Sequence, residues 1–248
     1  MTRLKLESFK DRLHAMGVHF IASLILAVLA LLLVYKVWYP WPLGEAVGVT
    51  NILVLMLAVD VVIGPLLTFV IFDRRKKSLR IDLLLIIALQ LLAFFYGMYA
   101  VAQGRPAWIV FNVDRFDIVR AYEIDNREVD FVHEDFKFAP WFGPKWVAAI
   151  LPDDAKERAK LLQESLSGGA DLAQRPKYYV SLDVVKPKIM ERVKKPYDLL
   201  LFNNKNIITN FSDISVFGWL PLMANHTPMV VIVDKLTGEL KIVPLRPW

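Results

Sequence analysis

The stretch GVHFIASLILAVLALLLVYKVW, from Gly17 to Trp38, decides the fold class of this chain. At 1.5 Å per residue, about 20 apolar residues in a helix cross the roughly 30 Å hydrocarbon core of a bilayer. No Asp, Glu, Lys or Arg interrupts the run before Lys36, whose long stem lets its ammonium reach the interface. The stretch therefore predicts a transmembrane helix.

Two further runs of similar length follow, Ile52–Phe72 and Ile81–Ala102. Three buried core helices of this composition in succession would need a large soluble core around them, so this alternative is disfavoured. A cleaved signal peptide has a shorter apolar run. A prepilin leader at Met16-Gly17 lacks the acidic residue that would be expected shortly after it. The chain is thus predicted to be an integral membrane protein with an uncleaved first helix.

The basic residues predict the orientation of these helices. Lys and Arg are frequent before the first run and between the second and third runs, and they are absent between the first and second. Short basic flanks stay in the cytoplasm. The predicted organisation is a cytoplasmic N-terminus (1–16), helix 17–38, a periplasmic loop (39–51), helix 52–72, a basic cytoplasmic loop (73–80), helix 81–102 and a periplasmic domain (103–248).

Charge and cysteine content exclude several classes of function. From Gln103 onward the chain has 20 Lys and Arg against 19 Asp and Glu, so the outer domain is nearly neutral and does not resemble a nucleic-acid binder. The basic surplus lies in the cytoplasmic flanks, where it meets anionic lipid. The chain has no cysteine, which excludes disulfides, thiol catalysis and cysteine-ligated metals.

The outer domain is predicted to be an α+β fold. Alternating apolar residues and turn signals indicate strands, and Pro152-Asp153-Asp154 before a 3.6-residue periodicity indicates a helix that ends at Gly168-Gly169. Segment 136–146 shows no periodicity and stays unassigned. The predicted strands are 107–113, 116–122, 199–202, 229–233 and 240–243, the last two forming a hairpin, and a short helix is expected at 188–193.

No catalytic, cofactor or metal site is predicted. The four histidines lack metal-ligand spacing, and His133-Glu134-Asp135 is typical of an exposed turn. The chain has no phosphate-binding glycine loop and no serine in a nucleophile elbow. The chemistry of this sequence therefore points to binding rather than to catalysis.

One polar group stands out inside the apolar runs. Asp60 lies near mid-depth of the second run, and an acid there costs at least ~2.5–3.5 kcal/mol unless it meets a partner or water. Gln90 lies at a similar depth in the third run, so the two are expected to approach each other, with a protonated Asp60 as one alternative. Gly64 and Pro65, one turn beyond Asp60, predict close helix contact and a kink. The hypotheses are an internal packing bond, a docking point for a partner's helix, or an ion pathway.

Several short motifs follow one another in a distinctive order over nearly the whole chain. The most specific is the run Asp-x-x-x-Gly-Pro-Leu-Leu-Thr from Asp60 to Thr68. The others are Trp38-Tyr39-Pro40, Lys77-Ser78-Leu79-Arg80-Ile81-Asp82-Leu83, Val113-Asp114-Arg115-Phe116, Gly218-Trp219-Leu220-Pro221-Leu222 and Pro244-Leu245-Arg246-Pro247-Trp248. In the order of these motifs the chain resembles the TfpX/TfpZ family of type IV pilin accessory proteins.

This resemblance implies a non-enzymatic factor of the bacterial inner membrane that works with a cognate major pilin and supports pilus assembly. Membrane contacts are expected at Asp60 and Gly64, and recognition of the pilin head at Asp114, Arg115 and Phe116 or at Trp219 and Trp248. The alternatives are a membrane-anchored periplasmic sensor and a pilin-modifying enzyme. The oligomeric state does not follow from the sequence.

Overall fold

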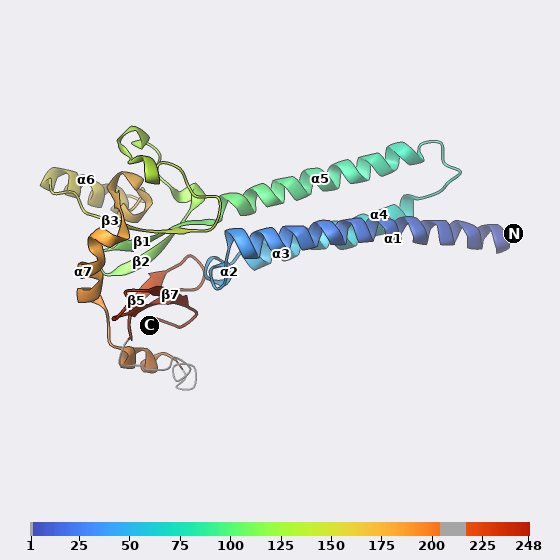
Figure 1. Ribbon diagram of the computed structural model, residues 1–248. Coiled ribbons are helices and arrows are strands. Elements are labelled where there is room, and N and C mark those ends of the chain that lie inside the picture. The colour runs from blue at the N-terminus through green and yellow to red at the C-terminus, as the bar shows by residue number, and fades with distance from the viewer. Residues whose placement is uncertain (1, 204–216) are drawn as a thin grey trace. The chain divides into compact units, whose positions relative to one another are not determined.

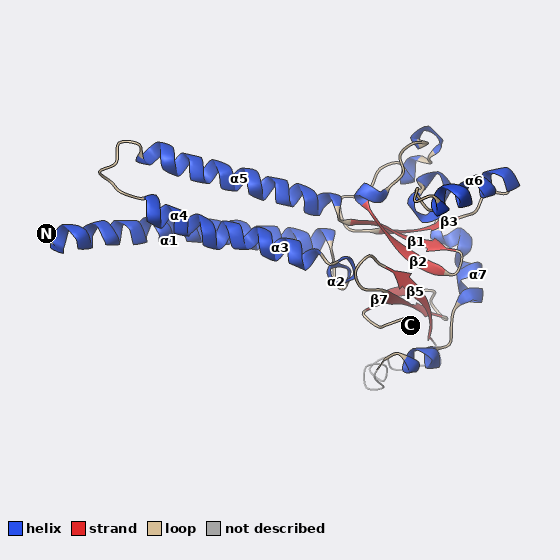
Figure 2. Ribbon diagram, turned by 180° about the vertical axis from the view of Figure 1, so that it is seen from behind, coloured by secondary structure: helices blue, strands red, loops and turns tan. Residues whose placement is uncertain are grey.

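The computed structural model describes residues 2–203 and 217–248, and it divides into two compact units (Figure 1). The first unit comprises Met1–Lys36 and Val49–Ala102, and the second comprises Val37–Gly48 and Gln103–Trp248. All strands belong to the second unit (Figure 2). The predicted division into a helical part and a sheet-containing part is therefore confirmed, with one difference: the loop after the first helix belongs to the sheet unit.

The first unit consists of three long helical segments. Three helices in the described residues are long and apolar enough to cross a membrane: Ser8–Trp38, Val49–Ile71 and Leu79–Gln103. The first of these helices packs along the second. The third is mostly exposed, since only 11% of its apolar central stretch is buried. The elements are α1 (Thr2–Leu33) with a π-helical turn (Val34–Trp38), then α3 (Val49–Ala58), a second π-helical turn (Val59–Ile63) and α4 (Gly64–Ile71), and then α5 (Leu79–Gln103).

Ion pairs bring the two basic segments to the same end of this unit. Arg74 lies 3.0 Å from Asp11, and Arg12 lies 3.9 Å from Asp73. These contacts join the beginning of α1 to the connection between α4 and α5. The two segments predicted to share the cytoplasmic side are thus neighbours in space.

The second unit is built on one mixed seven-stranded sheet with the order β4-β3-β1-β2-β5-β6-β7. The β1–β3 and β2–β5 pairs are parallel, and the other neighbours are antiparallel. The strands are β1 (Pro106–Asn112), β2 (Arg115–Arg120), β3 (Lys145–Ala149), β4 (Tyr179–Val180), β5 (Phe217–Met223), β6 (Met229–Asp234) and β7 (Leu240–Val243).

Helices cover both faces of the sheet, so β1 is buried along its whole length. Ile109 and Phe111 of β1 face a core completed by α7 (Leu182–Arg192). Trp108 and Val110 alternate to the other face, where α6 (Ala155–Leu166) and Tyr179 cover them. A third cluster, under a 3₁₀ helix at Pro196–Leu201, contains Trp219 and Ile232.

The segment between the first two long helices forms part of the core of this unit. Leu43 and Ala46 of α2 (Leu43–Val47) are buried against the sheet, and the Ala46 carbonyl accepts hydrogen bonds from the N–H groups of His226 and Thr227. The sequence analysis predicts only a loop here, at 39–51. Its apolar side chains are what draw it into the core.

Three sequence predictions need correction. The predicted strand Leu199–Phe202 is instead the end of a 3₁₀ helix that begins at Pro196, a residue preorganised for the first turn, and Phe202 is its C-cap. The strand pattern of β5 was missed because Gly218 and Pro221 interrupt it. The helix expected at 188–193 begins earlier, at Leu182, and ends at Arg192. The other predicted strands, the hairpin with Gly238 at positive φ and the helix after Asp154 are confirmed.

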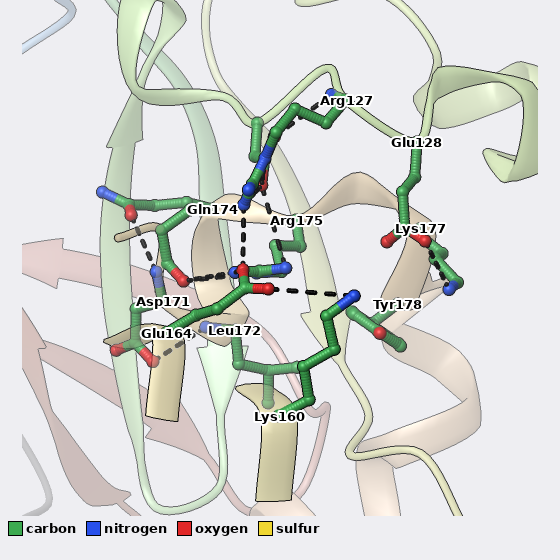
Figure 3. A network of polar contacts seen from close by, with 12 residues as sticks. Arg127, Glu128, Lys160, Glu164, Asp171, Leu172, Gln174, Arg175, Lys177 and Tyr178 are labelled. Carbon is green, nitrogen blue, oxygen red and sulfur yellow. Dashed lines mark hydrogen bonds and ion pairs between the residues drawn. The ribbon is translucent and has the colours of Figure 1, made fainter. Parts of the chain in front are cut away.

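A network of ion pairs fixes the chain that precedes β3 and β4 (Figure 3). Glu164 on α6 contacts Arg175 and Arg127, and Arg127 also pairs with Asp125 at 2.7 Å. Hydrogen bonds from Arg175 and Arg127 hold the pKa of Glu164 below its usual range. A second group of ion pairs joins Lys177 to Glu128 at 3.0 Å and to Glu157 at 2.9 Å.

The substitution Glu164→Gln is expected to lower the thermal unfolding midpoint of the full chain in detergent at neutral pH. The folded-state pKa of Glu164 is lowered, so its contribution is present above the unfolded value of about 4.3 and is lost as pH falls through the folded value. The difference from the natural chain should therefore shrink below about pH 4. Lys160→Gln is the control, since its exposed pair with Glu164 spans 3.9 Å. A difference that does not change with pH would contradict this account.

Candidate functional site

Asp60 lies in the π-helical turn between α3 and α4 and is buried, with 5% of its surface exposed. In this turn the N–H of Gly64 bonds the carbonyl of Val59, five residues earlier. Pi turns are rare and are found mostly where a helix must adapt locally, often at functional sites. The turn therefore marks this part of the second apolar helix as irregular.

Pro65 explains why a partner is needed at this point. In the five-residue register, the carbonyl of Asp60 would accept from the nitrogen of residue 65, and proline has no N–H to give. Gln90 of α5 supplies the missing donor, since its Nε2 lies 3.3 Å from the Asp60 carbonyl oxygen. Gln90 and Asp60 thus meet as expected, but through the backbone of Asp60 rather than through its carboxylate.

Gly64 makes this contact sterically possible. A Cβ at position 64 would lie 1.8 Å from Gln90 Nε2. The glycine therefore allows the amide of Gln90 to reach the helix backbone, as small residues do at close helix contacts.

A cavity of about 500 Å³ lies beside this turn. Its walls come from α1, from the second long helix (α3, the π-helical turn and α4) and from α5. Most of its wall is apolar, including Leu26 and Ile87. Its polar residues are His14, His19, Ser23, Asp60, Thr68 and Gln90. His19 Nδ1 and Thr68 Oγ1 are 2.6 Å apart, which ties α1 to α4.

Two acceptors in this cavity have no partner within the described chain. Asp60 Oδ2 and Gln90 Oε1 are buried and unbonded. A buried acceptor without a donor is costly, most of all in an apolar setting. The cavity is therefore complementary to an apolar surface that carries a hydrogen-bond donor.

The spacing of polar residues in the sequence points to three further residues of the cavity, His19, Ser23 and Thr68. His19 and Ser23 are one helical turn apart, and Asp60, Gly64 and Thr68 follow each other at the same spacing. Residues at i and i+4 share a helix face. Reading this spacing within each apolar run would have identified the polar faces that meet in the cavity.

The candidate residues of the outer domain do not form one site. Asp114 is exposed at the β1–β2 turn, beside Val113, whose φ of 60° is strained for a β-branched residue. Arg115 Nε donates a hydrogen bond to Asp117 Oδ1 at 2.9 Å. Burial raises the pKa of Asp117. Within the described chain no group of three or more His, Asp or Glu side chains is placed to hold a metal ion.

Phe116 and Trp219 must be removed from the expected recognition surface. They are 0% and 2% exposed and pack inside the sheet unit, so neither side chain is offered to a partner. Trp248 is 54% exposed and remains available. Tyr39 and Trp108 are also buried in this unit. Aromatic character alone did not distinguish core from surface here.

The described architecture defines a class: three long apolar helices around a largely apolar cavity that carries a few polar groups, joined to a sheet domain. Residues 7–48 match the family model described as Fimbrial assembly protein FimB. The chain is 35% identical to "Fimbrial assembly protein, serogroup I" of Dichelobacter nodosus over 230 residues, which covers 88% of this chain and 89% of that protein. "Fimbrial assembly protein, serogroup E1" of the same organism is 34% identical over 180 residues, 72% of this chain and 70% of that protein.

The chain belongs to the fimbrial assembly protein family. The fimbrial assembly role implied by the short motifs is thus supported, whereas the TfpX/TfpZ name is not the one that these relatives carry. No solved structure matches the fold.

Replacing Gly64 by Ala is expected to destabilise the helical unit, because the added Cβ would collide with Gln90. Overpacking of this kind costs roughly 1–3 kcal/mol. Thermal unfolding of the full chain in detergent measures the effect. Gly17→Ala is the matched control, since a Cβ at Gly17 meets no atom within 4 Å. Equal unfolding midpoints for the two variants would contradict the proposed Gly64–Gln90 contact.

Proposed function

We propose that this chain is an accessory factor of the bacterial inner membrane that contacts a type IV pilin and supports its assembly into pili. The observation that carries the proposal is the match over most of the chain to proteins named for fimbrial assembly. A pilin with an apolar helix in the same bilayer and a head on the same side could be contacted by both units of this chain. The role is binding rather than catalysis.

In this proposal the three apolar helices cross the inner membrane, with residues 1–16 in the cytoplasm and residues 103–248 in the periplasm. The distribution of Lys and Arg supports this orientation. The folding of residues 37–48 together with residues 103–248 also supports it, because both segments must then lie on the same side of the membrane. Three crossings place them on the same side.

The cavity at Asp60 is the proposed seat for the pilin's membrane helix. Its apolar wall suits the side chains of one helix face, and its volume of about 500 Å³ is enough for a few of them. Gln90 Oε1 can only accept, and Asp60 Oδ2 accepts when the acid is ionised, so the matching group on the pilin helix is a hydrogen-bond donor. The small buried share of α5 leaves its surface available to a further helix.

Photocrosslinking in living cells tests the proposal. A photoreactive residue at Ile87, which lines the cavity, is expected to form adducts with the major pilin. A probe at Leu84, an exposed residue of the same helix outside the cavity lining, is the matched control and should give mainly lipid or background adducts. Adducts of Ile87 only with itself or with unrelated proteins would contradict pilin contact and would favour the sensor alternative.

The variant Asp60→Leu is expected to lower pilus number and the Ile87–pilin adduct several-fold while leaving the bundle folded. Removing a buried, unbonded acid should not destabilise an apolar bundle and should rather stabilise it, since the acid is costly there. Electron microscopy of cells and thermal unfolding in detergent measure the two effects. Thr50→Val, which removes a polar group bonded to Tyr35 outside the cavity lining, is the control. Normal piliation with Asp60→Leu would contradict a docking role for this residue.

A further inference from the structure

The segment Phe138-Ala139-Pro140-Trp141-Phe142, here called the aromatic loop, presents large apolar side chains to the surroundings. Phe138 is 76% exposed, Trp141 55% and Phe142 90%. Single exposed apolar residues are ordinary, but a contiguous aromatic group marks an interaction surface. The question is what covers it.

Two contacts fix the position of this loop within the second unit. The Arg105 guanidinium lies over the Trp141 ring at 4.0 Å, and its Nε donates to the Pro140 carbonyl at 3.1 Å. The Trp141 ring also lies 6.5 Å from the ring of Trp38. The aromatic loop is therefore held between Trp38 and Arg105.

Both of these contact residues adjoin the ends of apolar helices. Trp38 is the last residue of the first candidate span, and Arg105 follows Gln103, the last residue of the third, by two positions. The first and third spans of a three-crossing protein end on the same side of the membrane. The contacts of the loop with Trp38 and Arg105, together with chain connectivity, therefore place the aromatic loop within a few residues' reach of the bilayer surface.

The chemistry of the loop suits that location. Phe and Trp side chains partition into the region between headgroups and hydrocarbon, where Trp and Tyr are enriched. Trp41, which follows Trp38 by three positions, is 72% exposed and adds a further aromatic group to the same region of the chain. The exposed Lys145, just after the loop, can pair with lipid phosphates.

We propose that the aromatic loop is an interfacial anchor whose Phe138 and Phe142 side chains insert into the periplasmic leaflet. This inference rests on the proposed membrane-spanning topology and adds to it a fourth point of membrane contact. The anchor holds the sheet domain against the bilayer surface, where the head of a membrane-bound pilin emerges.

Depth-dependent fluorescence quenching tests the anchor. The natural chain has no cysteine, so single cysteines can carry an environment-sensitive dye without further changes. The full chain is placed in vesicles of phosphatidylethanolamine and phosphatidylglycerol with lipids spin-labelled either near the headgroup or near the chain end. The test position is Phe142→Cys. Leu236→Cys, with 81% exposure on the β6–β7 turn, is the control on the same unit, and Leu92→Cys on α5 reports the span itself.

The expected result is blue-shifted emission at position 142, quenched several-fold more strongly by the shallow label than the dye at position 236. The dye at position 92 should be quenched more strongly by the deep label. A quenched position 92 with an unquenched position 142 would overturn the anchor alone. An unquenched position 92 would overturn the membrane-spanning topology on which the anchor rests. A shift at position 142 that requires added pilin would make the loop a protein-binding surface and would also overturn the anchor.

Discussion

A backbone carbonyl without a donor costs several kcal/mol in hydrocarbon, and the second apolar helix contains one that the backbone of the same helix cannot satisfy. Pro65 removes the N–H that the Asp60 carbonyl would use in the π-helical register. The amide of Gln90 replaces it, and Gly64 leaves the space through which that amide enters. The hydrogen bond from Gln90 to the Asp60 carbonyl therefore links α5 to the second apolar helix. It leaves the Asp60 carboxyl group and the Gln90 side-chain oxygen at the cavity, without a partner in the described chain.

The sheet unit depends on a second constraint. The chain between the first two long helices has to supply part of the core of this unit. Leu43 and Ala46 complete one face of the sheet, and the backbone of Ala46 is bonded from residues 226 and 227. The unit is thus assembled from segments that precede the second apolar helix and follow the third. Such a domain can form only after all three helices have been made, since β1 follows α5 directly. The order of the chain thus makes folding of the sheet unit depend on prior synthesis of the helical unit.

Much of this architecture could be predicted from the residues. Apolar runs of bilayer length, alternating strands and the Gly238 turn are local signals, and all of them were confirmed except the predicted strand at 199–202, which is a 3₁₀ helix. The proximity of Asp60 and Gln90 followed from their matching depth in two helices. The fate of the aromatic residues did not, because burial depends on which surfaces meet after folding. Phe116 and Trp219 became core, whereas Phe138 and Phe142 stayed exposed. The docking of residues 37–48 was hidden for the same reason.

A disulfide scan tests the central claim, that the cavity at Asp60 receives the membrane helix of a pilin. Ile87→Cys on the cavity wall would be combined with single cysteines along the apolar segment of the major pilin, in cells expressing both proteins. The account predicts crosslinks that recur about every three to four pilin residues, since one helix face enters the cavity. It also predicts that Asp60→Leu weakens them. Crosslinks spread evenly along the pilin segment, or equally strong from Leu84→Cys, would contradict it.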